Sequence, residues 1–261
     1  MAHLLQLLLT SVVVSQVVLQ QCCDATDVPV AVTSVSRGLA SYVRDIAVDR
    51  DNNLLYVSTG NDYCVYRLAS NGASAQVIAG SSGEYGTADG VGGAARFGNL
   101  CGITCDTANH IAYISDCGNQ RIRTLDLTNN NVTTLAGSSP GYQDGIGGAA
   151  QFYNPNGIVH YTSRIDGMVL LFVAATGSGR IRRIVVASAT VTTVAQTTYL
   201  CYYLCISRDG SSLFVGTVYT VVKINTSTNA IVTLAGGASF GSTDGIGASA
   251  RFNYAYGIAL N

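Results

Sequence analysis

A stretch with very few side-chain atoms recurs three times in this 261-residue chain. It reads ADGVGGAARF up to Phe97, QDGIGGAAQF up to Phe152 and TDGIGASARF up to Phe252. The repetition extends further, because alanines in four similar apolar runs stand at positions 79, 136, 195 and 235, at intervals of 57, 59 and 40 residues. About 40 residues is the length of one four-stranded propeller blade. One such sheet cannot bury both of its faces alone, so the copies must stack.

The second copy shows how the repeated unit divides into strands. Residues 102–106, 110–115, 120–127 and 131–137 are β-prone runs, and turn-rich pieces separate them. Runs of this kind at this spacing predict antiparallel hairpins. The composition agrees, since the helix formers lysine and glutamate occur once each, as Lys223 and Glu84. We therefore predict an all-β fold, a β-propeller of four-stranded antiparallel blades with about four blades and an incomplete fifth.

The glycine-rich stretch is expected to connect one blade to the next. The two long intervals equal a 40-residue blade plus 17 (57 − 40) and 19 (59 − 40) further residues. These further residues lie between the last strand of one blade and the first strand of the next, and they are missing before Cys201. Because every blade has the same polarity, all copies should emerge on one face. Loops gathered on one face of a repeat protein are the default place for binding.

The two ends of the repeat predict an incomplete ring. Residues 254–261 begin a fifth blade with a first strand, and residues 28–35 resemble a last strand. The middle strands of that blade are missing, and such a sheet would leave open edges. We expect residues 26–261 to form an incomplete propeller that belongs to a longer one. The alternative is a four-blade ring that the two terminal strands close.

The clearest copy of the repeat carries a family resemblance. Residues 135–158 contain LAG, then DGIGGAAQF, then NPNGI. In most copies a β-prone run, a turn such as Gly118-Asn119 and an Ile-Arg pair follow. This pattern resembles the NHL-repeat β-propellers over residues 38–261, which implies the propeller fold. The Asn-His pair that names the family is absent, since Asn61-Asp62 and Asn119-Gln120 stand in its place. Related propellers include amidating lyases with metal-bound histidines, and no matching histidine set is present in this sequence.

The N-terminus is typical of a secretory signal peptide. Residues 4–19 are almost entirely apolar, a run shorter than the roughly 20 residues of a membrane-spanning helix. The small residues Cys23 and Ala25 precede a suitable cleavage site. We predict a signal peptide over residues 1–25, with an uncleaved anchor as the alternative, and no membrane span after cleavage. The protein would then be secreted or lie on the extracellular face of the cell surface, where the sequons at Asn131 and Asn225 predict N-glycosylation.

Cysteine usage agrees with an oxidising compartment. Six cysteines would follow the cleavage site, and an even number in a secreted chain predicts disulfides. The disulfide candidates are Cys101, Cys105, Cys117, Cys201 and Cys205. In a straight strand, residues four apart lie about 13 Å apart, which is too far for a Cys101–Cys105 bridge. Either the chain bends before the strand, or Cys101 pairs elsewhere, for example with Cys117. Cys64 is expected to be a buried thiol.

The acidic residues of the glycine-rich stretches are the candidate ligand-binding residues. They are Glu84, Asp89, Asp144 and Asp244. The structural interpretation is that each aspartate accepts hydrogen bonds from the backbone N–H groups that follow it, while the phenylalanine fills the gap between blades. The alternative is that these carboxylates ring one face and bind a hard cation such as calcium. The GxGxxA pattern is not a dinucleotide site, because that site uses one such loop in a βαβ unit.

Other side-chain chemistry is sparse. The net charge is −1 and no basic run is present, so no nucleic-acid partner is predicted. His110 and His160 are not grouped, and the arginines of the third strands are interpreted as edge charges. We therefore predict a non-enzymatic interaction module without a cofactor, which binds a protein or glycan through the inter-blade loop face. The alternative is a metal-dependent hydrolase or lyase with a site at the central channel.

Overall fold

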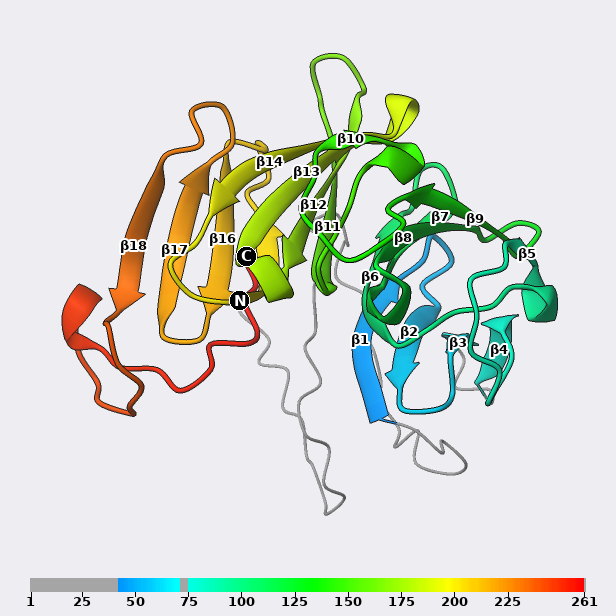
Figure 1. Cartoon of the computed structure of the whole chain (residues 1–261), viewed down its shortest axis with the longest axis horizontal. Helices are drawn as coiled ribbons and strands as arrows, with labels where there is room; N and C mark the ends of the chain where they lie inside the picture. Colours follow the sequence, from blue (N-terminus) through cyan, green and yellow to red (C-terminus); the bar gives the residue numbers. More distant parts are fainter. Residues whose placement is uncertain (1–41, 71–74, 261) are drawn as a thin grey trace.

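The computed structural model describes residues 42–70 and 75–260, and in this part the chain is all-β (Figure 1). Four antiparallel blades follow one another along the chain, each built from four consecutive long strands, which confirms the predicted blades. The predicted signal peptide at 1–25 and the strand-like residues 28–35 lie outside the described residues. Among residues 42–70 and 75–260, no helix is long and apolar enough to cross a membrane.

Each blade uses its strands in sequence order. The first blade comprises β1 (Tyr42–Val48), β2 (Leu54–Thr59), β3 (Cys64–Leu68) and β4 (Gln76–Gly80). The second comprises β6 (Leu100–Asp106), β7 (Ile111–Asp116), β8 (Arg121–Asp126) and β9 (Asn131–Ala136). The third comprises β11 (Pro155–Thr162), β12 (Val169–Ala175), β13 (Arg180–Val185) and β14 (Thr190–Gln196). The fourth comprises β15 (Cys201–Ile206), β16 (Ser212–Thr217), β17 (Thr220–Asn225) and β18 (Ile231–Gly236).

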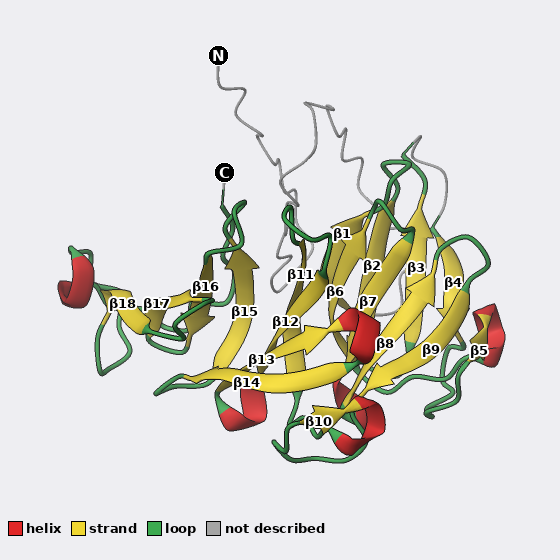
Figure 2. Cartoon of the chain, turned by 90° about the horizontal axis from the view of Figure 1, so that it is seen from above, coloured by secondary structure: helices red, strands yellow, loops and turns green. Residues whose placement is uncertain are grey.

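The blades are arranged around their first strands. β1 packs against β6, β6 against β11, and β11 against β15, so these four are the inner strands. The outer strands β4 and β18 lie at opposite ends of the row of blades in both views (Figures 1 and 2). This arrangement is a β-propeller, as the repeat spacing predicts.

Every inner strand has a bulge near its start. In β1 the register shifts between Val43 and Asp45, so Arg44 is the extra residue, and Cys101 and Tyr202 are its counterparts in β6 and β15. A bulge redirects a side chain and adds local twist. The residue after the bulge is glycine in β6, where an added Cβ would lie 2.3 Å from the Asn156 carbonyl oxygen. The backbones of the second and third blades therefore approach each other directly at this point.

Phenylalanines fill the gaps between the blades, as expected. Phe97 is fully buried among apolar residues of the first two blades, and Phe152 is fully buried among those of the second and third. Each ends a glycine-rich stretch, so the stretch delivers one large apolar side chain to the gap. Burying a phenylalanine contributes roughly 1.5–3 kcal/mol relative to exposing it.

The glycine-rich stretches also tie the outer strands of neighbouring blades together (Figure 2). The two-residue strands β5 (Gly90–Val91) and β10 (Gly145–Ile146) pair with β9 and β14 and give those sheets a fifth strand. The tight turns that follow, Gly92–Ala94 and Gly147–Ala149, pack against the outer strands β4 and β9 of the preceding blades. Each stretch therefore links two blades, because its short strand pairs with the following blade and its turn packs against the preceding one. We call this stretch the clasp.

Candidate functional site

One end of the blades carries all the inter-blade segments and the turns between second and third strands, and we call it the loop face. The antiparallel order of the strands places these segments at the same end. The hairpins between first and second strands and between third and fourth strands lie at the opposite end. Asn131 begins β9 and Asn225 ends β17, so both predicted glycosylation sites lie at this opposite end. Glycans attached there would leave the loop face uncovered.

The structure gives three of the four candidate acidic residues an arginine partner. Asp89 accepts from the Arg123 guanidinium at 2.8 Å and from the Thr134 hydroxyl at 2.9 Å. Asp144 repeats this arrangement with Arg182 and Thr193 at the same distances. Both aspartates accept from strands of the following blade. The expectation that they bond to the backbone immediately after them is therefore wrong.

Glu84 and Asp244 complete the set of predicted carboxylates. Glu84 forms an ion pair with Arg96 at the first clasp. Asp244 is exposed, and β18 is the outer strand that precedes it. Among the described residues, no group of three or more His, Cys, Asp and Glu could hold a metal ion. The role of these four residues in ligand binding stays a prediction.

Two arginines of the third strands are buried, so their interpretation as edge charges is wrong. Arg123 and Arg182 are each 0% exposed, and their guanidinium groups lie 5.0 and 5.1 Å from the ring centres of Phe97 and Phe152. Arg123 also pairs with the fully buried Asp116 at 3.0 Å. Sequence reasoning missed these pairs because β5 must dock on β9 before Asp89 meets Arg123.

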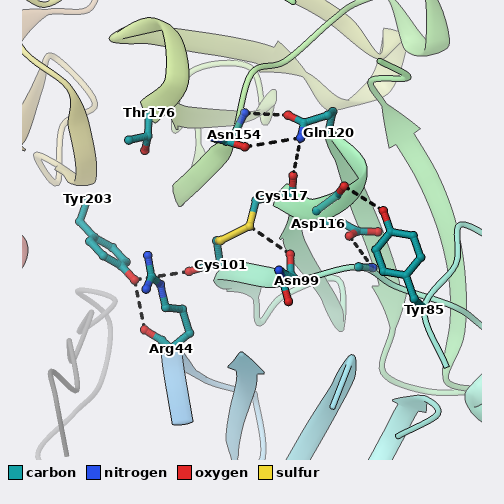
Figure 3. The surroundings of a disulfide bond; sticks show 12 residues. Arg44, Tyr85, Asn99, Cys101, Asp116, Cys117, Gln120, Asn154, Thr176 and Tyr203 are labelled. Atoms are coloured by element: carbon teal, nitrogen blue, oxygen red, sulfur yellow. Dashed lines mark hydrogen bonds between the residues drawn. A yellow bond between two sulfur atoms is a disulfide. The ribbon is translucent and has the colours of Figure 1, made fainter. Parts of the chain in front are cut away.

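A pocket of about 380 Å³ opens at the loop face between the first and second blades. Its lining residues are Arg44, Gly60, Asn61, Tyr63, Asn99, Cys101 and Cys117. Arg44 comes from the bulge of β1, while residues 60–63 form the β2–β3 turn. Figure 3 shows Arg44, Asn99 and the two cysteines around this site. The volume is at the small end of the roughly 300–1,000 Å³ of ligand pockets.

A disulfide forms one wall of the pocket. Cys101 and Cys117 are bonded, with their Cα atoms 5.9 Å apart, so the cross-hairpin alternative is the correct one (Figure 3). Cys105, Cys201 and Cys205 are buried thiols, and Cys64 is a buried thiol as expected. The disulfide joins the start of β6 to the turn after β7. It therefore fixes the two backbone segments that line the second-blade side of the pocket.

Tyr203 connects the fourth blade to the pocket. Its hydroxyl lies 3.1 Å from the Arg44 carbonyl oxygen and 3.4 Å from the Cys101 carbonyl oxygen, and it donates to both (Figure 3). Next to Arg44, the Asp45 carboxyl is 1% exposed and accepts from the N–H groups of Ile46 and Ile103 at 2.9 Å. Burial raises the pKa of Asp45 to about 8, although the two backbone hydrogen bonds and the Arg44 charge oppose the shift.

Exposed tyrosines lie on the loop face, and one of them, Tyr85, is next to the pocket. Tyr85 is 58% exposed, packs edge-on against the half-buried Tyr63 at 5.6 Å, and donates to the Gly118 carbonyl oxygen. Farther along, Tyr142 lies under the Arg180 guanidinium at 4.0 Å, and Tyr153 is also exposed. Tyrosine rings held by such contacts offer rigid amphipathic surface at a low entropy cost.

The histidines lie at the opposite end of the blades. His110 lies in the β6–β7 turn, and its Nε2 is 2.9 Å from the Arg50 guanidinium. His160 Nε2 is 3.4 Å from the buried Asp106 carboxylate. Burial of Asp106 opposes its ionisation, but hydrogen bonds from His160 and Asn109 outweigh this effect and hold the pKa of Asp106 at about 2. This pair joins the second blade to the third.

Asp106→Asn is expected to change how stability depends on pH. A carboxyl with a lowered folded pKa contributes stability above its unfolded pKa, and this contribution is lost as the pH falls towards 2. The variant should lose about 2 kcal/mol of unfolding free energy at pH 7, and the difference from wild type should vanish near pH 2. Urea unfolding from pH 7 to pH 2 measures it, with the exposed Asp51→Asn as control. A difference that does not change with pH would contradict the assignment.

Comparison with known proteins identifies the fold and no family. No protein-family model matches the chain. A Bacteroides thetaiotaomicron protein of unknown function is 14% identical with a TM-score of 0.59, and the match covers 85% of this chain and 55% of that one. An auxiliary nutrient binding protein from Bacteroides ovatus is 16% identical with a TM-score of 0.52 (66% and 45% covered). A streptogramin B lyase is 12% identical with a TM-score of 0.50 (74% and 54%).

These structures share the propeller fold. A curated relative, protein SUPPRESSOR OF QUENCHING 1, chloroplastic, from Arabidopsis thaliana, is 32% identical over 112 residues, which are 42% of this chain and 10% of that protein. The chain thus spans about half the length of the solved structures and a tenth of the plant protein. At such identities and coverage, function must be argued from the site.

Proposed function

We propose that this chain is a non-enzymatic interaction module of the NHL-repeat type, which binds a protein or glycan through its loop face. The observation that carries the proposal is the pocket of about 380 Å³ on that face, next to the exposed Tyr85. A concave site with a few convergent polar groups beside aromatic side chains is the usual form of a small-ligand site. Of the two partner classes, a glycan fits better, because the volume of this pocket matches one sugar unit and is too small for a protein surface.

The proposed location is outside the cell or on its outer surface. The Cys101–Cys117 disulfide supports this location, since disulfides persist mainly in oxidising compartments. The predicted glycosylation sites, Asn131 and Asn225, lie away from the pocket, so glycosylation is compatible with binding at the loop face.

The alternative function from the sequence is a metal-dependent hydrolase or lyase. Its supporting observation is the fold shared with a streptogramin B lyase. At 12% identity this likeness supports the fold alone. We therefore propose the binding module.

Tyr85→Ala is expected to abolish or strongly weaken glycan binding by the purified protein on a glycan microarray. The ring would no longer border the pocket, and stacking surface would be lost. Tyr161→Ala is a matched control, because the Tyr161 hydroxyl also donates to a backbone carbonyl, that of Asp209, but lies at the opposite end of the blades. This variant should bind as wild type does. Equal loss in both variants, or no glycan bound by wild type, would contradict the proposal.

A further inference from the structure

The residue at the bulge of the inner strand differs from blade to blade, and at the pocket it is Arg44. The bulge of the inner strand holds Cys101 in the second blade and Tyr202 in the fourth, whereas the first blade places an arginine there. The Arg44 side chain lines the pocket, and its guanidinium lies beside the Tyr203 hydroxyl (Figure 3). Bulges are over-represented next to active sites, where they redirect a side chain.

The charge of Arg44 has no carboxylate partner among the described residues. The ion pairs within 4.0 Å in this part of the chain do not include Arg44. Its Nε is buried without a hydrogen-bond partner there. The adjacent Asp45 carboxyl bonds instead to two backbone N–H groups. Because burial raises the pKa of Asp45 to about 8, the negative charge that this carboxyl offers Arg44 is reduced at pH 7.

The other polar groups of the pocket complement an anionic oxygen. Asn61 and Asn99 line it, and the Asn61 Oδ1 accepts from the Tyr63 hydroxyl at 3.2 Å. That bond leaves the Asn61 NH₂ group as a donor. Arginine provides a planar pair of donors that matches a carboxylate. Arg44 is the single cation of the lining, so the pocket fits one singly charged group.

The remaining walls fit a carbon skeleton. Tyr63 and the two disulfide-bonded cysteines also line the pocket, and an aromatic ring and a disulfide are weakly polar groups. A ligand with one carboxylate on a compact ring satisfies both sides of the pocket.

Resting on the proposed function, we propose that this pocket is a carboxylate subsite that recognises an acidic sugar, a uronic or sialic acid unit of a glycan. The Arg44 guanidinium binds the carboxylate, and the Asn61 and Asn99 amides assist it. The Tyr63 ring and the disulfide contact the sugar ring.

The test is titration calorimetry of the whole protein with glucuronic acid, glucose and a glutamate-containing tripeptide as probes. Glucuronic acid should bind, and glucose should bind about tenfold more weakly, because it lacks the charge-assisted hydrogen bonds. The Arg44→Gln variant should bind glucuronic acid about tenfold more weakly than wild type and glucose with wild-type affinity. The Arg44→Lys variant should show an intermediate loss of affinity for glucuronic acid. Arg50→Gln, which changes an exposed arginine at the opposite end, should bind as wild type does.

Three results would overturn the inference. Wild-type affinity in Arg44→Gln would show that Arg44 does not bind the carboxylate, and equal affinity for glucose and glucuronic acid would show that no charge is recognised. Tighter binding of the tripeptide would assign the site to acidic peptides. In each of these cases the proposed function would still stand if the protein bound neutral glycans on the array and lost this binding in Tyr85→Ala. A wild-type protein that binds no glycan on the array would instead remove the proposed function itself.

Discussion

Arg123→Met is expected to lower the free energy of unfolding by about 3–5 kcal/mol, the usual cost of removing one partner of a buried ion pair. Asp116 is 0% exposed and would keep its carboxylate in the interior without the positive charge. Burial already raises the pKa of Asp116, although hydrogen bonds from Asn119, Gly98 and Arg123 oppose the shift. In the variant, the Asp116 carboxylate therefore either stays buried as an uncompensated charge or binds a proton.

Arg182→Met provides the matched control. Arg182 is equally buried and has the same contacts with its clasp, but its carboxylate partner, Asp144, is 49% exposed. Water can solvate Asp144 once the arginine is gone, so we expect a loss of about 1–2 kcal/mol. Adding Asp116→Ala to Arg123→Met should recover part of the larger loss. Equal losses in the two single variants, measured by urea unfolding at pH 7, would contradict the role given to the buried Asp116.

Removal of the disulfide is expected to have the second largest effect. Cys101→Ser with Cys117→Ser opens a loop that spans 16 residues, and the chain-entropy estimate for a loop of this size is about 3 kcal/mol. The unfolding free energy of wild type in a reducing buffer should fall by a similar amount. The two segments that line the pocket would also lose their link, so binding of glucuronic acid should weaken.

A conservative change at a buried thiol is the control for this experiment. Cys64→Ala keeps the disulfide and should lose less stability than the double variant, and a reducing buffer should still destabilise it. If reduction left the unfolding free energy of wild type unchanged, the bridge would not stabilise the folded state. If the double variant kept its affinity for glucuronic acid, the wall assigned to the disulfide would not shape the pocket.

The architecture could be predicted from the sequence because the repeat encodes it. The 40-residue interval and the β-prone runs predicted four strands per blade, and the phenylalanines were correctly placed between blades. Cys101 and Cys201 each begin a C-x-x-x-C run, but they do not occupy equivalent positions in their blades. The pairing of β15 with β16 shows that Cys201 corresponds to Leu100 and precedes the bulge.

The pocket could not be predicted in the same way, because its residues depart from the repeat. Arg44 and Asp45 stand where the second blade has Cys101 and Gly102. A repeat analysis emphasises what the copies share, while this site depends on what one copy has alone. Similarly, the contact between Asp89 and Arg123 joins residues 34 positions apart, and it forms only when the clasp docks on the next blade. An alignment of the four inner strands at their bulges would have shown Arg44 as the single charged residue among them.

Hydrogen–deuterium exchange, with and without a glycan selected on the array, would locate the ligand on the protein. If the ligand binds at the loop face of the first two blades, it should protect the β2–β3 turn at 60–63, the start of β6 at 99–101 and the turn at 117–119, and leave the opposite hairpins unchanged. Protection confined to those opposite hairpins, or to the fourth blade, would contradict binding at this face.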